Sequence, residues 1–282
     1  MHETSPPRDA IWIALMIGNS RLHWAIFSGN QLQQTWNTPH LSQETAQQLK
    51  TNQFDLTILL PPHPSLPTPH SPLPLWIASV VPSQSVAWQE YPHAHFLTLE
   101  HVPLQGTYST LGIDRALAVW GAISLVGSPA LVIDAGTALT FTGADRNHQL
   151  VGGAILPGVQ LQFRALSQGT AALSELPTPY TPHPTPLPPR WALNTHDAIA
   201  SGVIHTLIAS IRSFVEDWWQ RFPDSTVILT GGDGDRLYDH IKQQVPALAA
   251  RITVNPAILF EGIRAVRRRQ AEGREQKGTG ER

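Results

Sequence analysis

The chain contains the same local pattern twice: an apolar strand, a short polar tip with a glycine, and a second apolar strand. The first copy covers residues 11–27 around a tip at Gly18, and the second covers residues 130–143 around a tip at Gly136. Short apolar runs separated by glycine and polar residues are typical of β-hairpins. The repeat therefore predicts a chain built from two similar halves.

Helical patterns alternate with these hairpins. Apolar residues recur at helical spacing in Leu41–Thr51, Asp114–Val126 and His196–Gln220, and a further strand, Ser225–Thr230, leads into a glycine turn. Strands that alternate with helices indicate an α/β fold with mixed sheets. We therefore predict an α/β chain of two duplicated domains.

The domain boundary is expected just before the long helix that starts near Asp114. This gives an N-terminal domain over residues 10–114 and a C-terminal domain over residues 115–270. Residues 271–282 are polar and poor in apolar anchors, which predicts a disordered tail. Proline is concentrated in residues 60–75 and 177–189, which are expected to be surface loops because proline lacks a backbone donor.

Composition excludes several classes of function. The chain has 282 residues, a formal charge of -2 and no cysteine. The charge gives no electrostatic reason to expect nucleic acid, and the absence of cysteine excludes disulfides, thiolate metal sites and a cysteine nucleophile. We identify neither a targeting signal nor an apolar run of about 18 residues that could span a membrane. The expectation is a cytoplasmic protein without membrane or nucleic-acid partners.

The second tip has the composition of a phosphate-binding turn. Backbone N–H groups at a glycine turn, with the hydroxyl of Thr137 beside them, can bind phosphate oxygens. The carboxylate of Asp134 could bind a cation that neutralises those phosphates. Gly-Thr pairs at strand ends are also common in plain turns, so this motif alone leaves a structural role open.

Asp114 and Arg115 follow Gly112 at the expected start of a helix. One interpretation is structural, because an aspartate at a helix start stabilises the first turn by about 1 kcal/mol. The other is catalytic: Asp114 would accept a proton from an attacking hydroxyl, and Arg115 would bind a substrate oxygen or carboxylate. Local sequence does not separate the two interpretations.

Seven motifs in fixed order resemble the type III pantothenate kinases over nearly the whole chain. They are Gly18-Asn19-Ser20, Ser79-Val80-Val81-Pro82, Gly112-Ile113-Asp114-Arg115, Asp134-Ala135-Gly136-Thr137-Ala138, Gly152-Gly153-Ala154-Ile155-Leu156-Pro157-Gly158, Asn194-Thr195 with Ser201-Gly202, and Thr230-Gly231-Gly232-Asp233-Gly234. The resemblance implies two ribonuclease H-like domains of the actin-like ATPase fold, with a nucleotide cleft between them. It also implies ATP-dependent phosphorylation of pantothenate to 4'-phosphopantothenate, the first step of coenzyme A biosynthesis.

By matching positions, the resemblance implies a role for each motif. Asp114 would be the catalytic base and would bind pantothenate together with Gly112, Ile113, Arg115, Thr195 and Tyr108. Asp134 would hold a monovalent cation, K+ or NH4+, and Mg2+ would arrive with ATP. A homodimer is implied, with the pantothenate pocket completed by the partner subunit. ATP would be bound by Thr137 and by the first tip, which comprises Met16, Ile17, Gly18, Asn19, Ser20, Arg21, Leu22 and His23.

One residue and one segment depart from the family pattern. The first tip normally begins with aspartate, but this chain has Met16, whose thioether is a poor ligand for a hard cation. The segment before Gly112 is shorter than usual and lacks its proline, which affects the assignment of Tyr108. The alternative function is therefore a non-catalytic ligand-binding or regulatory relative with a degenerate first tip. A superfamily kinase acting on a sugar is disfavoured by the substrate motif at Gly112.

Overall fold

The computed structural model describes residues 11–52, 55–56, 59, 73–169 and 186–279. The chain divides into two units. Unit 1 contains residues up to Pro103, Thr107–Gly121 and the C-terminal segment from Leu259, whereas unit 2 contains Leu104–Gly106 and Ala122–Ile258. Each unit has its own sheet and its own apolar core.

The sheet of unit 1 has five strands in the order β3-β2-β1-β4-β5. The first predicted hairpin forms its antiparallel part, and the last two strands run parallel to β1. The strands are β1 (Ile11–Ile17), β2 (Leu22–Ser28), β3 (Gln31–Thr38), β4 (Leu75–Ser79) and β5 (Ala94–Phe96).

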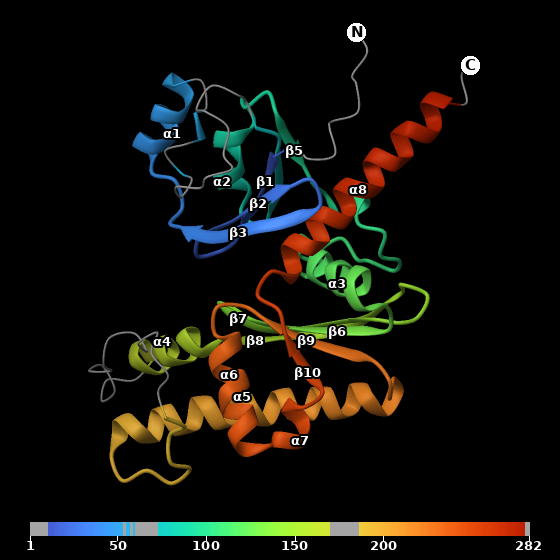
Figure 1. The fold of residues 1–282 in the computed structure, drawn as a ribbon. Helices are drawn as coiled ribbons and strands as arrows, with labels where there is room; N and C mark the ends of the chain where they lie inside the picture. Colours follow the sequence, from blue (N-terminus) through green and yellow to red (C-terminus); the bar gives the residue numbers. More distant parts are fainter. Residues whose placement is uncertain (1–10, 53–54, 57–58, 60–72, 170–185, 280–282) are drawn as a thin grey trace. The chain divides into compact units, whose positions relative to one another are not determined.

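The sheet of unit 2 has the same topology. Its order is β10-β9-β6-β7-β8, with β6-β7-β8 antiparallel and β6-β9-β10 parallel (Figure 1). The strands are β6 (Ala130–Ala135), β7 (Ala138–Ala144), β8 (Leu150–Pro157), β9 (Thr226–Thr230) and β10 (Ile252–Val254). The predicted duplication and the predicted α/β class are therefore confirmed.

The three helices expected from periodicity form within two residues of their predicted ends. They are α1 (Gln43–Thr51), α3 (Ile113–Val126) and α5 (Thr195–Arg221). The remaining helical segments are α2 (Pro82–Ser85), η2 (Val86–Trp88), η3 (Leu99–His101), α4 (Val159–Gly169), α6 (Gly234–Gln244), α7 (Pro246–Ala249) and α8 (Ile258–Thr279).

Helix α5 is the central helix of the unit 2 core. It begins at the Asn194 cap, whose side-chain oxygen accepts from the backbone N–H of Asp197, and it buries one apolar face from Ile199 to Trp218. Trp218 packs onto Gly143 of β7 and donates to the hydroxyl of Ser225 at 2.7 Å. Among the described helices, α5 alone is long and apolar enough to cross a membrane. Its buried face accounts for that composition.

Helix α8 belongs to unit 1, although the sequence-based boundary placed it in the second domain. It lies beside α3 (Figure 1), and Gly262 permits this approach because a Cβ there would lie 2.0 Å from the carbonyl oxygen of Leu117. Arg264 donates to the carbonyl oxygen of Asn30 at 2.8 Å. Sequence order did not indicate this return because the contacts join residues that are 145 and 234 positions apart in the chain.

Two sequence expectations fall largely or partly outside the described residues. Most of the proline-rich segments lies in residues 60–72 and 177–185, which are not described. Helix α8 extends to Thr279 and so includes most of the expected tail, while residues 280–282 are not described.

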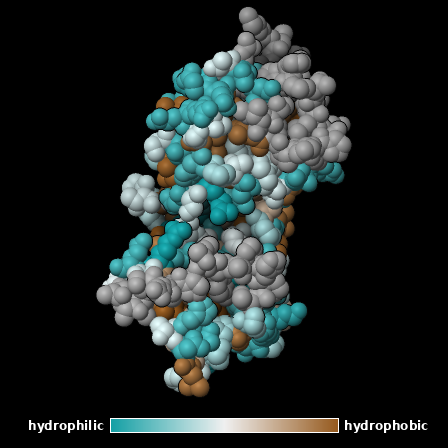
Figure 2. Space-filling model, turned by 90° about the vertical axis from the view of Figure 1, so that its left-hand side faces the viewer, coloured by the Kyte–Doolittle hydropathy of each residue, from teal (hydrophilic) through white to brown (hydrophobic). Residues whose placement is uncertain are grey.

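On the face of the molecule in Figure 2, hydrophobic residues are scattered among hydrophilic ones.

Candidate functional site

Three glycine turns meet at the second tip, within unit 2. Gly136 donates to the carbonyl oxygen of Ala138 at 3.1 Å and closes the hairpin. Gly231 has φ +93, and a Cβ there would lie 2.4 Å from Asp134 Oδ1. A Cβ at Gly158 would lie 2.3 Å from the carbonyl oxygen of Gly136. Only glycines allow these backbones to approach so closely. The turns thus hold Asp134 in a fixed place.

Hydroxyl side chains flank Asp134 on its face of the sheet. Asp134 is paired with Thr140 across β7 and with Thr230 across β9, and directly paired residues share a face. A carboxylate with neighbouring hydroxyl and carbonyl oxygens suits a hard cation. Within the described part of the chain, no cluster of three or more His, Cys, Asp or Glu side chains could hold a metal. A cation at Asp134 would therefore need further oxygens from the backbone, hydroxyls or a ligand.

Asp114 lies in the first turn of α3, in unit 1, as predicted from Gly112-Ile113-Asp114-Arg115. Its Oδ1 accepts from the backbone N–H of Arg115 at 2.8 Å, and a Cβ at Gly112 would lie 2.3 Å from the same oxygen. Burial raises the pKa of Asp114, and the backbone hydrogen bond and the charge of Arg115 partly oppose that rise. A buried carboxylate whose pKa is raised is a stronger proton acceptor, which suits a general base.

Arg115 and Tyr108 form a pair beside Asp114. Arg115 is 9% exposed, and its Nη1 donates to the phenolic oxygen of Tyr108 at 3.1 Å. Tyr108 itself is 46% exposed. The shorter segment before Gly112 therefore still brings Tyr108 to the Asp114-Arg115 motif.

The first tip connects β1 and β2 of unit 1. Met16, Ile17 and Leu22 are buried. Ile17 and Leu22 belong to the apolar core cluster of unit 1, whereas Met16 is not among the residues of that cluster. Asn19, Ser20 and Arg21 are exposed at the turn itself. The tip is closed by a hydrogen bond of 3.1 Å from the Gly18 N–H to the Arg21 carbonyl oxygen.

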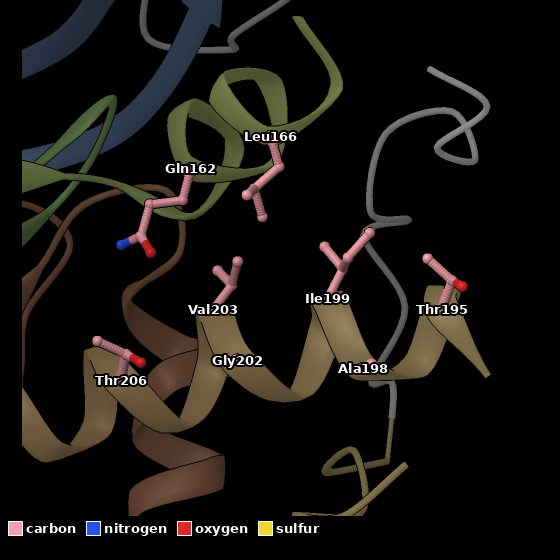
Figure 3. Close-up of a pocket in the computed structure, with 8 residues that line it drawn as sticks. All are labelled: Gln162, Leu166, Thr195, Ala198, Ile199, Gly202, Val203 and Thr206. Atoms are coloured by element: carbon pink, nitrogen blue, oxygen red, sulfur yellow. The ribbon is translucent and has the colours of Figure 1, made fainter. Parts of the chain in front are cut away.

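Thr195 lies in a groove between α4 and α5, also within unit 2. The groove has a volume of about 500 Å³ and is open to solvent. Figure 3 shows Gln162 and Leu166 pointing from α4 toward α5, with Thr195 at one end of the row on α5 and Thr206 at the other. The remaining lining residues are Ala198, Ile199, Gly202 and Val203. Hydroxyls at the ends and apolar side chains between them suit a small amphipathic ligand.

Sequence reasoning selected Thr195 but not its neighbours in this groove. Residues 195, 199, 203 and 206 recur at helical spacing on α5, and this signal could have identified them. Nothing comparable marks Gln162 and Leu166, because they reach the groove only through the packing of α4 on α5.

Apart from Thr195 in the groove, the site residues predicted from the sequence thus form three groups. In unit 1, Tyr108 and residues 112–115 form one group and the first tip, residues 16–23, forms another. In unit 2, Asp134 and Thr137 share the second tip, and Thr195 lies in the groove of α5.

Solved structures with similar folds support the two-unit architecture. The chain is similar to a protein from Campylobacter jejuni described as a conserved putative Baf family transcriptional activator, with a TM-score of 0.56 and 18% identity over 92% of this chain and 99% of that one. It is also similar to the activator of the 2-hydroxyisocaproyl-CoA dehydratase from Clostridium difficile, with a TM-score of 0.50 and 10% identity over 95% and 97%. Together with the duplicated sheets, these likenesses support the predicted actin-like ATPase fold.

Sequence relatives define the family. A family model described as type III pantothenate kinase matches residues 12–217. A type III pantothenate kinase of Nostoc sp. is 50% identical over 267 residues, which cover 90% of this chain and 94% of the relative. One from Synechocystis sp. is 42% identical and covers 90% of both chains. By these matches, the chain belongs to the type III pantothenate kinase family.

Proposed function

We infer that the protein catalyses the ATP-dependent phosphorylation of pantothenate to 4'-phosphopantothenate, the first step of coenzyme A biosynthesis. Membership of the type III pantothenate kinase family carries this inference. Met16 was the only reason for a non-catalytic alternative. The relatives match this chain over nearly their whole length and are named as kinases, so they give that alternative no support.

We assign the role of general base to Asp114. Its carboxylate accepts the proton of the pantothenate hydroxyl while the hydroxyl oxygen forms a bond to the γ-phosphorus of ATP. The bond between that phosphorus and the bridging oxygen breaks, and ADP leaves with the electron pair. Burial of the carboxylate and the consequent rise of its pKa support this role, because they strengthen it as a proton acceptor.

Substrate binding is assigned to the residues beside that base and to Thr195. Arg115 offers a guanidinium that can pair with the pantothenate carboxylate, and Tyr108 offers a phenol held beside it. Gly112 and Ile113 contribute backbone groups of the same loop. Thr195 contributes a hydroxyl from the groove of α5, where an amphipathic substrate would meet both polar and apolar side chains.

Cations are assigned to the second tip and to the nucleotide. The oxygen-rich surroundings of Asp134 fit a monovalent cation, K+ or NH4+. Thr137 follows Gly136 in the same tip, and we assign its hydroxyl to the ATP phosphates. When bound, Mg2+ neutralises charge on the ATP phosphates during transfer. The protein's own task is to fix the tips and to hold Asp114 and Arg115 in place.

We further propose that the protein is a cytoplasmic homodimer in which each pantothenate pocket uses Asp114 of one subunit and Thr195 of the other. Light scattering would give the mass of the assembly. Complementation would test the shared pocket, because Asp114→Asn and Thr195→Val chains refolded together should regain about a quarter of wild-type activity if subunits mix randomly. A mixture as inactive as its components would contradict the shared pocket.

An assay of the purified protein with ATP, Mg2+, K+ and pantothenate tests the main proposal. The expected result is 4'-phosphopantothenate and ADP in equal amounts, with Asp114→Asn as the matched inactive control. If wild type forms no more product than that control, the protein is not a pantothenate kinase.

A further inference from the structure

The first tip lacks the charge that a divalent cation would need. Residues 10–43 contain no aspartate or glutamate, so the entire β1-β2-β3 segment has no carboxylate. The tip does carry a positive charge, on the exposed side chain of Arg21. Burial lowers the pKa of the neighbouring His23 imidazole, and the charge of Arg21 lowers it further. The local field therefore favours an anion over a cation.

Met16 occupies the position at which the family pattern has aspartate. It is 2% exposed and is paired with His23 across the hairpin, so the two side chains share a face of the sheet. A buried thioether is a soft, neutral group and a poor ligand for Mg2+, which takes oxygen ligands. The Met16 side chain therefore cannot serve as a ligand for Mg2+.

Two backbone carbonyls of the turn already accept hydrogen bonds from protein donors. The Gly18 carbonyl oxygen accepts from His40 Nε2 at 2.8 Å, which requires the proton of that imidazole to lie on Nε2. The Arg21 carbonyl oxygen accepts from the Gly18 N–H at 3.1 Å. Both carbonyls that frame the turn are therefore already engaged by protein donors.

His23 holds the tip from the other side. Its Nδ1 lies 2.6 Å from Asn37 Oδ1 on β3, and its Nε2 edge faces Gly18, where a Cβ would lie only 3.2 Å from Nε2. The His40 imidazole thus holds the backbone of the turn by a hydrogen bond to the Gly18 carbonyl, and the His23 imidazole lies beside Gly18. A fixed turn with a neighbouring guanidinium is an arrangement that binds phosphate oxygens.

We propose that the first tip binds the phosphates of the nucleotide directly, through its backbone and Arg21, with no divalent cation between protein and phosphate. This proposal rests on the proposed function, because it concerns the same nucleotide. Its consequence is that binding of ATP to this chain depends little on Mg2+. A carboxylate at position 16 would make binding depend on Mg2+, because it would repel phosphates that no metal shields.

Calorimetry on the full chain tests this. ATP is titrated in K+ buffer without pantothenate, once with Mg2+ and once with EDTA. For wild type, we expect the two Kd values to agree within about threefold. For Met16→Asp, binding in EDTA should be at least about tenfold weaker than with Mg2+. Gln33→Asp is the matched control, since it adds the same charge at an exposed position near the other end of the hairpin and should behave as wild type.

Arg21→Gln gives a second, independent test at an exposed position. It should weaken ATP binding about tenfold, and equally with Mg2+ and with EDTA. If Met16→Asp fails to fold, two measurements still test the proposal: the ratio of the wild-type Kd values for ATP in EDTA and in Mg2+, and the Kd values of Arg21→Gln. Loss of wild-type binding in EDTA, or unchanged binding by Arg21→Gln, would overturn the proposal. Failure of the proposed function looks different: ATP would still bind in EDTA, but pantothenate would not be phosphorylated.

Discussion

The guanidinium of Arg115 donates a hydrogen bond of 3.1 Å to the phenolic oxygen of Tyr108. The two residues lie seven positions apart in the chain, and the bond brings a half-exposed phenol to the loop that carries Asp114. A substrate that pairs with Arg115 would therefore meet Tyr108 as well. This relationship leads to the first of five predictions.

Tyr108→Phe should raise the KM for pantothenate about three- to tenfold and leave kcat nearly unchanged, because one hydrogen bond contributes about 1 kcal/mol. Steady-state kinetics with varied pantothenate measure this. Tyr91→Phe is the matched control, since Tyr91 donates to the Leu73 carbonyl oxygen elsewhere in unit 1 and its loss should leave KM unaltered. An unchanged KM in Tyr108→Phe would remove Tyr108 from the binding site.

Asp114→Asn should lower kcat by about 10²- to 10⁴-fold without lowering the melting temperature. Burial raises the pKa of this carboxyl above its ordinary 3.8, so the folded state disfavours its ionised form. Wild type should accordingly lose stability relative to the variant as the pH rises through the raised pKa, and should regain it below 3.8. Melting curves of wild type and Asp114→Asn across that pH range test the direction of this change in stability. A variant that melts lower at neutral pH would show that the carboxylate stabilises the fold.

Gly112→Ala should reduce kcat by at least about tenfold. The added methyl group would lie 2.3 Å from Asp114 Oδ1, so the carboxylate must move away from its position at the start of α3. Kinetics together with a melting curve separate a displaced base from a damaged fold. Wild-type kcat in a fully folded variant would mean that the position of Oδ1 is unimportant.

Asp134→Ala should lower turnover by about 10²-fold or more and abolish its dependence on K+. The reason is that the oxygen-rich surroundings of Asp134, between Thr140 and Thr230, would lose the carboxylate charge that attracts a cation. Rates measured in K+ and in a bulky organic cation test both effects. Asp145→Ala is the control, because Asp145 caps an exposed turn of unit 2 through the N–H groups of Asn147 and Gln149. Near-normal turnover in Asp134→Ala would refute the assignment.

Gly143→Ala should destabilise the protein by about 1–3 kcal/mol. Its methyl group would lie 2.5 Å from the ring of Trp218, which is packed in the core and cannot withdraw freely. Denaturant unfolding followed by tryptophan fluorescence measures the loss. Gly169→Ala is the control, because among the described residues no atom outside its chain neighbours and its own helix backbone lies within 4 Å of the added carbon. Equal stability of the two variants would show that Trp218 repacks without cost.

Much of the fold could be predicted because its signals are local. Apolar runs interrupted by glycine at residues 18 and 136 indicated both hairpins, and the periodicity of residues 196–220 indicated α5. The motifs proposed for the site are local as well, because Gly112 to Arg115 and Asp134 to Thr137 are each contiguous in the chain. Backbone conformation over a few residues depends mainly on neighbouring side chains, so reading along the chain recovers it.

Contacts between distant segments could not be predicted. The return of Gly262 to Leu117, the bond from His40 to the Gly18 carbonyl and the packing of α4 on α5 around Thr195 join residues that no spacing connects. Such contacts depend on how complete elements pack, and packing depends on shape and volume across the whole core. The chain's local patterns thus specified its duplicated strands, helices and motifs, while long-range packing specified which groups surround Thr195 and Gly18.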